Sequence, residues 1–193
     1  MKNKGFYFFI AYIVIEGKII ADSREKKMHT WSKMKSKLEK EHLADSLKGH
    51  ITYFATSFSK APDHWGRAAI LLDGKEVIEG SYCELWSNAD LLPKDETLND
   101  RLTRIFPYID ETAVKYGQFD HQCFYNAFGE FDNQSIEKSL ESKDLLVRIF
   151  AVLDKRVGKR RLLMLKENTD EKDEVFRTFL DIRMKAEGMD KKE

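Results

Sequence analysis

Residues 67–82, RAAILLDGKEVIEGSY, carry the clearest structural signal in the chain. Two runs rich in residues that favour strands flank the pair Asp73 and Gly74. A two-residue type I′ turn needs positive φ at both central positions, which Asp and Gly adopt easily. The stretch therefore predicts a β-hairpin with its turn at Asp73 and Gly74.

A helix and a further strand are predicted before this hairpin. In residues 30–49, TWSKMKSKLEKEHLADSLKG, Met34 and Leu38 recur at helical spacing, and Gly49 predicts the helix end. Residues 50–58, HITYFATSF, are rich in strand formers. The first half of the chain thus reads as a helix followed by three antiparallel strands.

After Pro93 the sequence becomes helical in character. Apolar residues at helical spacing predict three helices, marked by Leu98, Leu102 and Ile105, by Phe124, Phe128 and Phe131, and by Leu146, Ile149, Phe150, Leu153 and Val157. The third is apolar on its other faces too, which is typical of a buried central helix. A last helix is expected over about residues 171–187, ended by Gly188. The order of elements predicts an α+β fold with an N-terminal helix, a three-stranded antiparallel sheet and a C-terminal helical half.

Length and composition bound the class of protein. A chain of 193 residues, 42% hydrophobic and 34% charged, can bury a core as one domain, which we place at residues 28–193. Cys83 and Cys123 form no CxxC pair, so the sequence predicts neither a disulfide scaffold nor a structural zinc site and favours a cytoplasmic setting. No known catalytic or nucleotide-binding motif occurs. We assign no catalytic, metal or cofactor residues, and lean against an enzyme.

Residues 1–27 allow three interpretations. Lys2 and Lys4 precede ten apolar residues, FYFFIAYIVI, in the layout of an export signal, but no small-residue cleavage site follows. Ten residues are too few for a membrane-spanning helix, which needs roughly 20, and we expect no membrane association. The stretch IVIEGKII also suits a strand hairpin. We favour a third interpretation, in which these residues are an upstream extension and the true start is Met28. The strand hairpin is our second choice.

The densest charge lies in residues 153–166, which hold six Lys or Arg and one Asp. Lys155 and Arg156 suit the last turn of a helix, where cations complement the dipole, with Gly158 just after the helix end. That account leaves three further cations unexplained, although acids such as Asp154 could pair with them. A cluster of five cations can also contact an anion or an acidic partner. The candidate anion- or partner-binding residues are Lys155, Arg156, Lys159, Arg160 and Arg161.

A second candidate site is the predicted loop DHWGR, residues 63–67. Loops on a rigid scaffold often bind ligands, so His64, Trp65 and Arg67 are candidate ligand-binding residues. Turn hydrogen bonds and cover for the sheet edge are the structural alternative. His121 and Cys123 are two residues apart and do not face each other on a helix, so we expect Cys123 to be a buried small hydrophobe.

Several segments resemble a small bacterial family of hypothetical proteins with no assigned activity. They are WSK (31–33), DSLKG (45–49), GRAAILLDGKE (66–76), LDKRVGKRRL (153–162) and RMKAEG (183–188). The resemblance covers most of the chain from Met28 onward and implies no catalytic residues. A weaker, topological resemblance relates residues 31–82 to double-stranded-RNA-binding domains, which grip phosphates with a basic second helix. Here SYCELWSNAD (81–90) contains no Lys or Arg.

The sequence favours a non-enzymatic binding or regulatory protein with a basic contact site near residues 155–161. The alternatives are an RNA- or DNA-binding protein that uses residues 31–82 and the same cations, and a small enzyme of unassigned class. A protein-binding site predicts exposed apolar residues beside the cations. A nucleic-acid site predicts Lys159 to Arg161 on one exposed face with an aromatic nearby, and an enzyme predicts a deep pocket that includes His64 or His121.

Overall fold

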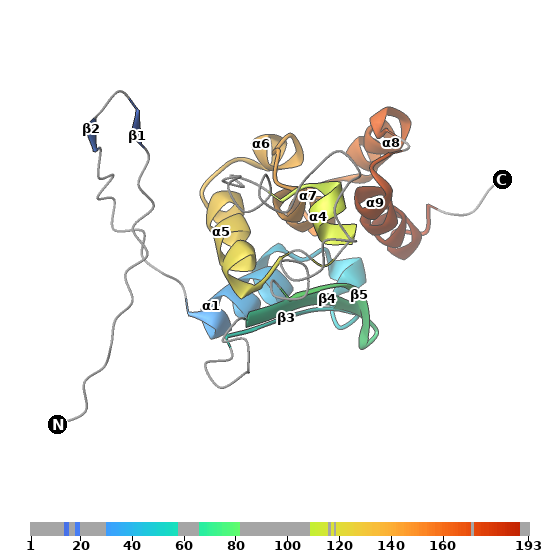
Figure 1. The fold of residues 1–193 in the computed structure, drawn as a ribbon. Coiled ribbons are helices and arrows are strands. Elements are labelled where there is room, and N and C mark those ends of the chain that lie inside the picture. The colour runs from blue at the N-terminus through green and yellow to red at the C-terminus, as the bar shows by residue number, and fades with distance from the viewer. Residues whose placement is uncertain are drawn as a thin grey trace.

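The computed structural model describes residues 14–15, 18–19, 30–57, 66–81, 109–115, 117, 119–170 and 172–189. In this part of the chain an N-terminal helix precedes a three-stranded antiparallel sheet, and further helices follow (Figure 1). The predicted α+β class is confirmed. Strands β1 (Val14–Ile15) and β2 (Lys18–Ile19) also pair as a short antiparallel hairpin, in agreement with the hairpin interpretation of IVIEGKII.

The sheet has the strand order β3-β4-β5, formed by Ile51–Ser57, Gly66–Leu72 and Lys75–Ser81. Its second turn is the predicted one, because Asp73 and Gly74 have φ values of 50° and 76°. The amide of Asp73 donates to the carbonyl of His50 at 2.8 Å and ties this turn to the start of β3. The prediction of a hairpin at Asp73 and Gly74 is therefore confirmed.

The N-terminal helix is shorter than the sequence predicts. It consists of a regular part and a π-helical part, α1 (Trp31–Ser36) and η1 (Lys37–His42), and ends well before Gly49. Leu43 is extended and forms a β-bridge with Asp154, and the amide of Ala44 donates to Leu153 O at 3.0 Å. Contact with the helical half, rather than the glycine, ends this helix. A 3-10 turn, η2 (Asp45–Leu47), then leads into β3.

Six helices are described in the C-terminal half: α4 (Glu111–Lys115), α5 (His121–Asp132), α6 (Ile136–Leu140), α7 (Leu145–Leu153), α8 (Lys159–Asn168) and α9 (Glu174–Ala186). Figure 1 shows this half on one face of the sheet, with α8 and α9 at one side. Every residue of α7 except Arg148 is buried, which confirms the predicted central helix. The last helix is also confirmed, with Gly188 at φ 70° behind it.

Aromatic side chains join the sheet to the helices. The predicted stripe of phenylalanines on α5 is buried, and the ring of Phe124 meets that of Phe150 on α7 with centroids 5.1 Å apart. The ring of Tyr53 on β3 also meets the ring of Phe150, with centroids 5.8 Å apart. These edge contacts fix how the helical half sits on the sheet. The predicted stripe of Leu98, Leu102 and Ile105 lies outside the described residues.

Candidate functional site

The chain between α7 and α8 contains the predicted basic cluster, but in a different local structure. Helix α7 ends at Leu153, and Lys155 and Arg156 lie in the turn that follows. The prediction that Gly158 directly ends the helix that contains Lys155 and Arg156 is wrong. Gly158 has a φ of −80° and is the N-cap of the next helix, α8. The last three cations of the cluster therefore form the first turn of α8. Cations at that end of a helix oppose its dipole, so the dipole does not explain them.

Arg156 is held against the turn by Asp154, although its side chain is 40% exposed. Its Nε and Nη2 atoms donate to the two carboxylate oxygens at 3.0 and 2.9 Å, and its backbone amide donates to the same group at 2.7 Å. The guanidinium also lies over the ring of Phe131, 5.5 Å from its centroid. Such a planar, two-point ion pair fixes the orientation of arginine. Arg156 thus stabilises the turn, as the structural alternative to a binding role predicts.

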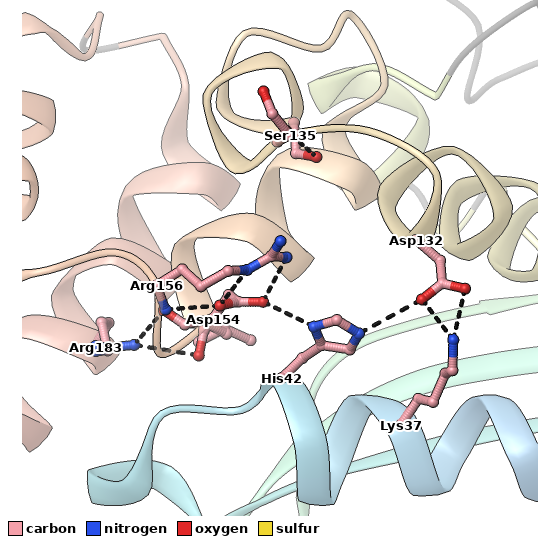
Figure 2. A network of polar contacts seen from close by, with 9 residues as sticks. Lys37, His42, Asp132, Ser135, Asp154, Arg156 and Arg183 are labelled. Carbon is pink, nitrogen blue, oxygen red and sulfur yellow. Dashed lines mark hydrogen bonds and ion pairs between the residues drawn. The ribbon is translucent and has the colours of Figure 1, made fainter.

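Asp154 also joins the turn to the N-terminal helix through His42, as Figure 2 shows. The Nδ1 atom of His42 lies 3.0 Å from Asp154, and its Nε2 atom lies 3.6 Å from Asp132 of α5. Lys37 donates to Asp132 at 2.8 Å. We call Lys37, His42, Asp132, Asp154 and Arg156 the polar network. It connects three segments that are distant in sequence, namely η1, α5 and the α7–α8 turn.

The charge of Asp154 depends on these partners. Its side chain is fully buried, and burial by itself raises the pKa of a carboxyl group. Hydrogen bonds from His42 and Arg156 outweigh that effect, so the pKa of Asp154 is lowered from its ordinary value. The carboxylate therefore stays charged at neutral pH. The sequence reasoning found no role for His42, because its partners are far away in the chain.

Arg183 of α9 completes the support behind the turn. It is 3% exposed, and its guanidinium donates to the carbonyls of Leu153, Asp154 and Val157 at 3.0–3.2 Å. Its Nε donates to Glu187 at 3.1 Å. Leu153 is the last residue of α7, and Asp154 and Val157 lie in the turn, so the bonds from Arg183 satisfy carbonyls that have no partner within a helix. The turn is consequently fixed from both sides, by the polar network and by α9.

The remaining cations of the cluster face outward. Arg161 pairs with Glu137 of α6 at 2.8 Å, and Lys159 donates to the carbonyl of Glu187 at 2.9 Å. The side chains of Lys155 and Arg160 are exposed and make no hydrogen bond or ion pair within the described residues. Arg156 is therefore fixed by Asp154, and Lys159 and Arg161 are each bound to one neighbouring helix. The other two cations are available to a partner.

Exposed apolar residues follow these cations on α8. Leu163 and Met164 are 49% and 53% exposed, and they lie one helical turn after Lys159 and Arg160. Next to them is a groove of about 240 Å³ between α6 and α8, whose lining includes Leu140, Met164 and Leu165. We call Lys155, Arg160, Leu163 and Met164 the α8 surface. It combines unpaired positive charge with apolar area, which sequence reasoning predicted for a protein-binding site.

The other predicted ligand residues are not brought together with this surface. His64 and Trp65 lie outside the described residues. Arg67 is on β4, where it pairs with Glu76 and Glu79 and lies over the ring of Phe54, 5.8 Å from its centroid. The nearest charges to Arg67 are thus acidic, which disfavours nucleic acid at this face of the sheet.

His121 and Cys123 lie at the start of α5. The ring of His121 packs against Gly66, where an added Cβ atom would be 1.8 Å from its Nδ1 atom. Burial raises the pKa of Cys123 to about 12, so this residue is a neutral thiol at physiological pH. Both observations agree with packing roles for the two residues.

The described residues contain no group of three or more His, Cys, Asp or Glu side chains placed to hold a metal ion. None of their helices is long and apolar enough to cross a membrane.

Comparison with protein families places the chain. Residues 30–184 match the model of the SF0329 protein family. The chain belongs to this family. The SF0329 match runs from the start of α1 into α9, and so includes the sheet, the polar network and the α8 surface. It supports the family resemblance drawn from WSK to RMKAEG and gives no support to a likeness with double-stranded-RNA-binding domains. Searches of curated proteins and of solved structures returned no match.

Proposed function

We propose that this protein is a non-enzymatic binding protein that holds a partner protein on the α8 surface. The observation that carries the proposal is the exposure of Leu163 and Met164 on the same helix as the unpaired Arg160, with the exposed Lys155 in the turn before that helix. Arg and Met are enriched in protein interfaces, and exposed apolar residues that are grouped mark contact sites. A complementary partner has an apolar patch bordered by Asp or Glu.

The setting of the α8 surface supports this role. The turn before α8 is fixed by the polar network and by Arg183, so the surface is presented on a rigid support. A rigid surface loses less conformational freedom on binding, which favours affinity. The groove beside Met164 can receive an apolar side chain of the partner, with the Glu137–Arg161 ion pair at its edge.

A protein partner fits this surface better than a nucleic acid does. Lys159 and Arg161 are tethered to α9 and α6, which leaves fewer cations for phosphates. The exposed side chains beside Arg160 are Leu163 and Met164, neither of which offers the flat ring on which bases stack. Nor do the described residues form a basic patch around Arg67 on the sheet. The charges paired with Arg67 are the carboxylates of Glu76 and Glu79.

The proposal is tested by site-specific photo-crosslinking in cells that express the full chain. A photoreactive residue replaces Met164 in one variant and Lys75, an exposed residue of the hairpin, in the control. We expect a discrete protein adduct with the first variant that is absent from the control. Adding Lys155→Glu and Arg160→Glu to the first variant is expected to abolish the adduct, because both changes repel an acidic partner.

Two outcomes would overturn the proposal. One is an adduct pattern that is the same at positions 164 and 75 and insensitive to the charge reversals. The other is salt-sensitive binding of duplex RNA or DNA in fluorescence anisotropy that is lost in the double charge-reversal variant, because it would make the cations phosphate contacts.

A further inference from the structure

A larger groove lies between α9 and the residues at the edge of the sheet, and none of the five cations of the basic cluster lines it. Its volume is about 700 Å³, within the range of pockets that bind small ligands. One wall is a stripe of α9 that includes Asp181 and Lys185, and the other includes His50 and Asp73 next to the sheet. We call it the α9 groove. It belongs to no site described above and is independent of the proposed partner.

The wall beside the sheet is rigid. Asp73 sits in the tight turn with a φ of 50°, and its amide donates to the carbonyl of His50 at 2.8 Å. The Nδ1 atom of His50 also lies 2.7 Å from the carboxylate of Asp73. The side-chain and backbone contacts together hold the imidazole in one orientation. Its Nε2 atom has no partner within the described residues, and so remains available to a ligand.

The wall on α9 carries one unpaired charge of each sign. Asp173, Arg177, Asp181 and Lys185 follow one another along α9 at i,i+4 spacing, at which opposite charges can pair. The structure does not contain these pairs: within the described residues, Asp181 and Lys185 make no ion pair or side-chain hydrogen bond. Both of them line the groove. Charges that are free and lie in a groove can be satisfied by a ligand with the opposite pair of charges.

The rest of the lining is aliphatic and fits an elongated ligand. Leu47, Leu72, Ile182 and Ala186 supply apolar surface between the two walls. The stripe on α9 runs from Thr178 to Ala186, which is roughly 12 Å along the helix axis. An extended chain of three to four residues has about this length. The groove thus exceeds what a single amino acid needs.

We infer that the α9 groove binds a short aliphatic peptide with free termini. Lys185 receives the carboxylate and Asp181 receives the ammonium group. The Nδ1 atom of His50 donates to Asp73, so its Nε2 atom accepts a hydrogen bond from a peptide N–H of the ligand, and the aliphatic residues of the groove contact the side chains. Free termini matter because they are the two charges that the unpaired residues of α9 complement. Neither the family match nor the proposed partner site implies this second site.

The test is isothermal titration of the full chain with trileucine, N-acetyl-trileucine, trileucine amide and free leucine. We expect trileucine to bind most tightly, and each blocked peptide to bind about two- to fivefold more weakly, since ion pairs at an open groove are worth that much. Lys185→Met is expected to remove the preference for the free carboxylate over the amide. Asp181→Asn is expected to remove the preference for the free ammonium over the acetylated peptide.

The matched control is Arg177→Gln, which changes an exposed cation on the same helix that is not part of the groove lining. It should bind all four compounds like the unmodified chain. The assignment is overturned if trileucine does not bind, if leucine binds as tightly as trileucine, or if the Lys185 and Asp181 variants keep both preferences. All three variants change exposed side chains, so their folding can be verified by thermal unfolding before titration.

Discussion

Arg156 and Arg160 are four residues apart in the same basic cluster, but they differ in the contacts that their side chains make. Both side chains are exposed, but Arg156 is bound by a fully buried aspartate and lies over the ring of Phe131, whereas Arg160 has no partner within the described residues. The difference comes from what surrounds each position. Arg156 follows the end of α7, where Asp154 and His42 are close, and Arg160 lies on the outer side of α8.

This contrast shows how charge can serve structure and binding within one motif. An ion pair with a buried carboxylate fixes geometry, because removing the cation leaves that carboxylate uncompensated inside the protein. An exposed cation contributes little to stability but remains available to a partner. The polar network and the α8 surface should therefore respond very differently to substitution, and four predictions test that difference.

The largest effect is expected from Asp154→Ala. The change removes the charged acceptor of His42 and of the side chain and amide of Arg156. Because a hydrogen bond to a charged group is worth about 1.5–3 kcal/mol, we expect the free energy of unfolding to fall by about 3–5 kcal/mol. Urea denaturation measures it. Asp181→Ala, an exposed aspartate without an ion pair, serves as the control and should change stability by less than about 0.5 kcal/mol. Equal costs for the two variants would show that the polar network does not hold the turn.

Neighbouring leucines of α8 give the next comparison. Leu162 is 0% exposed and Leu163 is 49% exposed. Leu162→Ala is expected to cost about 2–5 kcal/mol, because it opens a cavity under the helix. Leu163→Ala should cost less than about 0.5 kcal/mol and instead remove the crosslinked adduct. If denaturation midpoints shift equally for both, Leu163 has a packing role and the α8 surface is not a contact site.

Asp144 is a second buried aspartate, and the dependence of its contribution to stability on pH can be compared with that of Asp154. Burial raises the pKa of Asp144, the N-cap of α7, to about 6, although backbone amides oppose the rise. The folded chain then binds more protons than the unfolded chain between about pH 4 and pH 6, so this residue makes stability fall as pH rises through that window. Its contribution is up to about 3 kcal/mol.

Asp144→Asn keeps an oxygen acceptor for the cap but removes the titration. Urea denaturation of both proteins at pH 4.5 and pH 7 should therefore show the variant gaining stability relative to the original chain at the higher pH. Parallel pH profiles would mean that Asp144 ionises like an exposed carboxyl group. Asp154, whose pKa is lowered by its partners, is expected to act in the opposite direction.

The smallest effect on stability is expected from Lys155→Glu combined with Arg160→Glu. Both side chains are exposed and unpaired within the described residues, so the free energy of unfolding should stay within about 0.5 kcal/mol of the original value. Arg156→Glu is the matched contrast and should unfold the turn, because it places a carboxylate against Asp154. Thermal unfolding distinguishes the two.

Local patterns in the sequence predicted much of the fold. The Asp73-Gly74 turn, the buried stripe of α5 and the apolar α7 each depend on residues within one element. The errors arose where distant residues intervene. The first helix ends at His42 because Leu43 and Ala44 bond to the end of α7, and no residue near them in sequence signals this.

The basic cluster is visible in the sequence, but its local structure is not. Sequence reasoning identified the basic cluster and stated that exposed apolar residues beside it would favour a protein partner, but it assigned Gly158 to the wrong end of a helix. It also found no role for His42. The wider α9 groove was missed, because its walls come from the sheet and from α9, and no local motif joins them.

The sequence by itself determined the class of fold and the location of the charge. Strand and helix periodicity, turn residues and charge counts are local properties, so they can be read without knowing which segments meet. Tertiary structure decided what each charge does. His42 and Asp154 are 112 residues apart, yet they meet at the turn where the buried Asp154 binds Arg156, whereas Arg160 has no such partner within the described residues. The physical reason is that burial sets the energy of a charge, and burial exists only after the helical half has packed against the sheet.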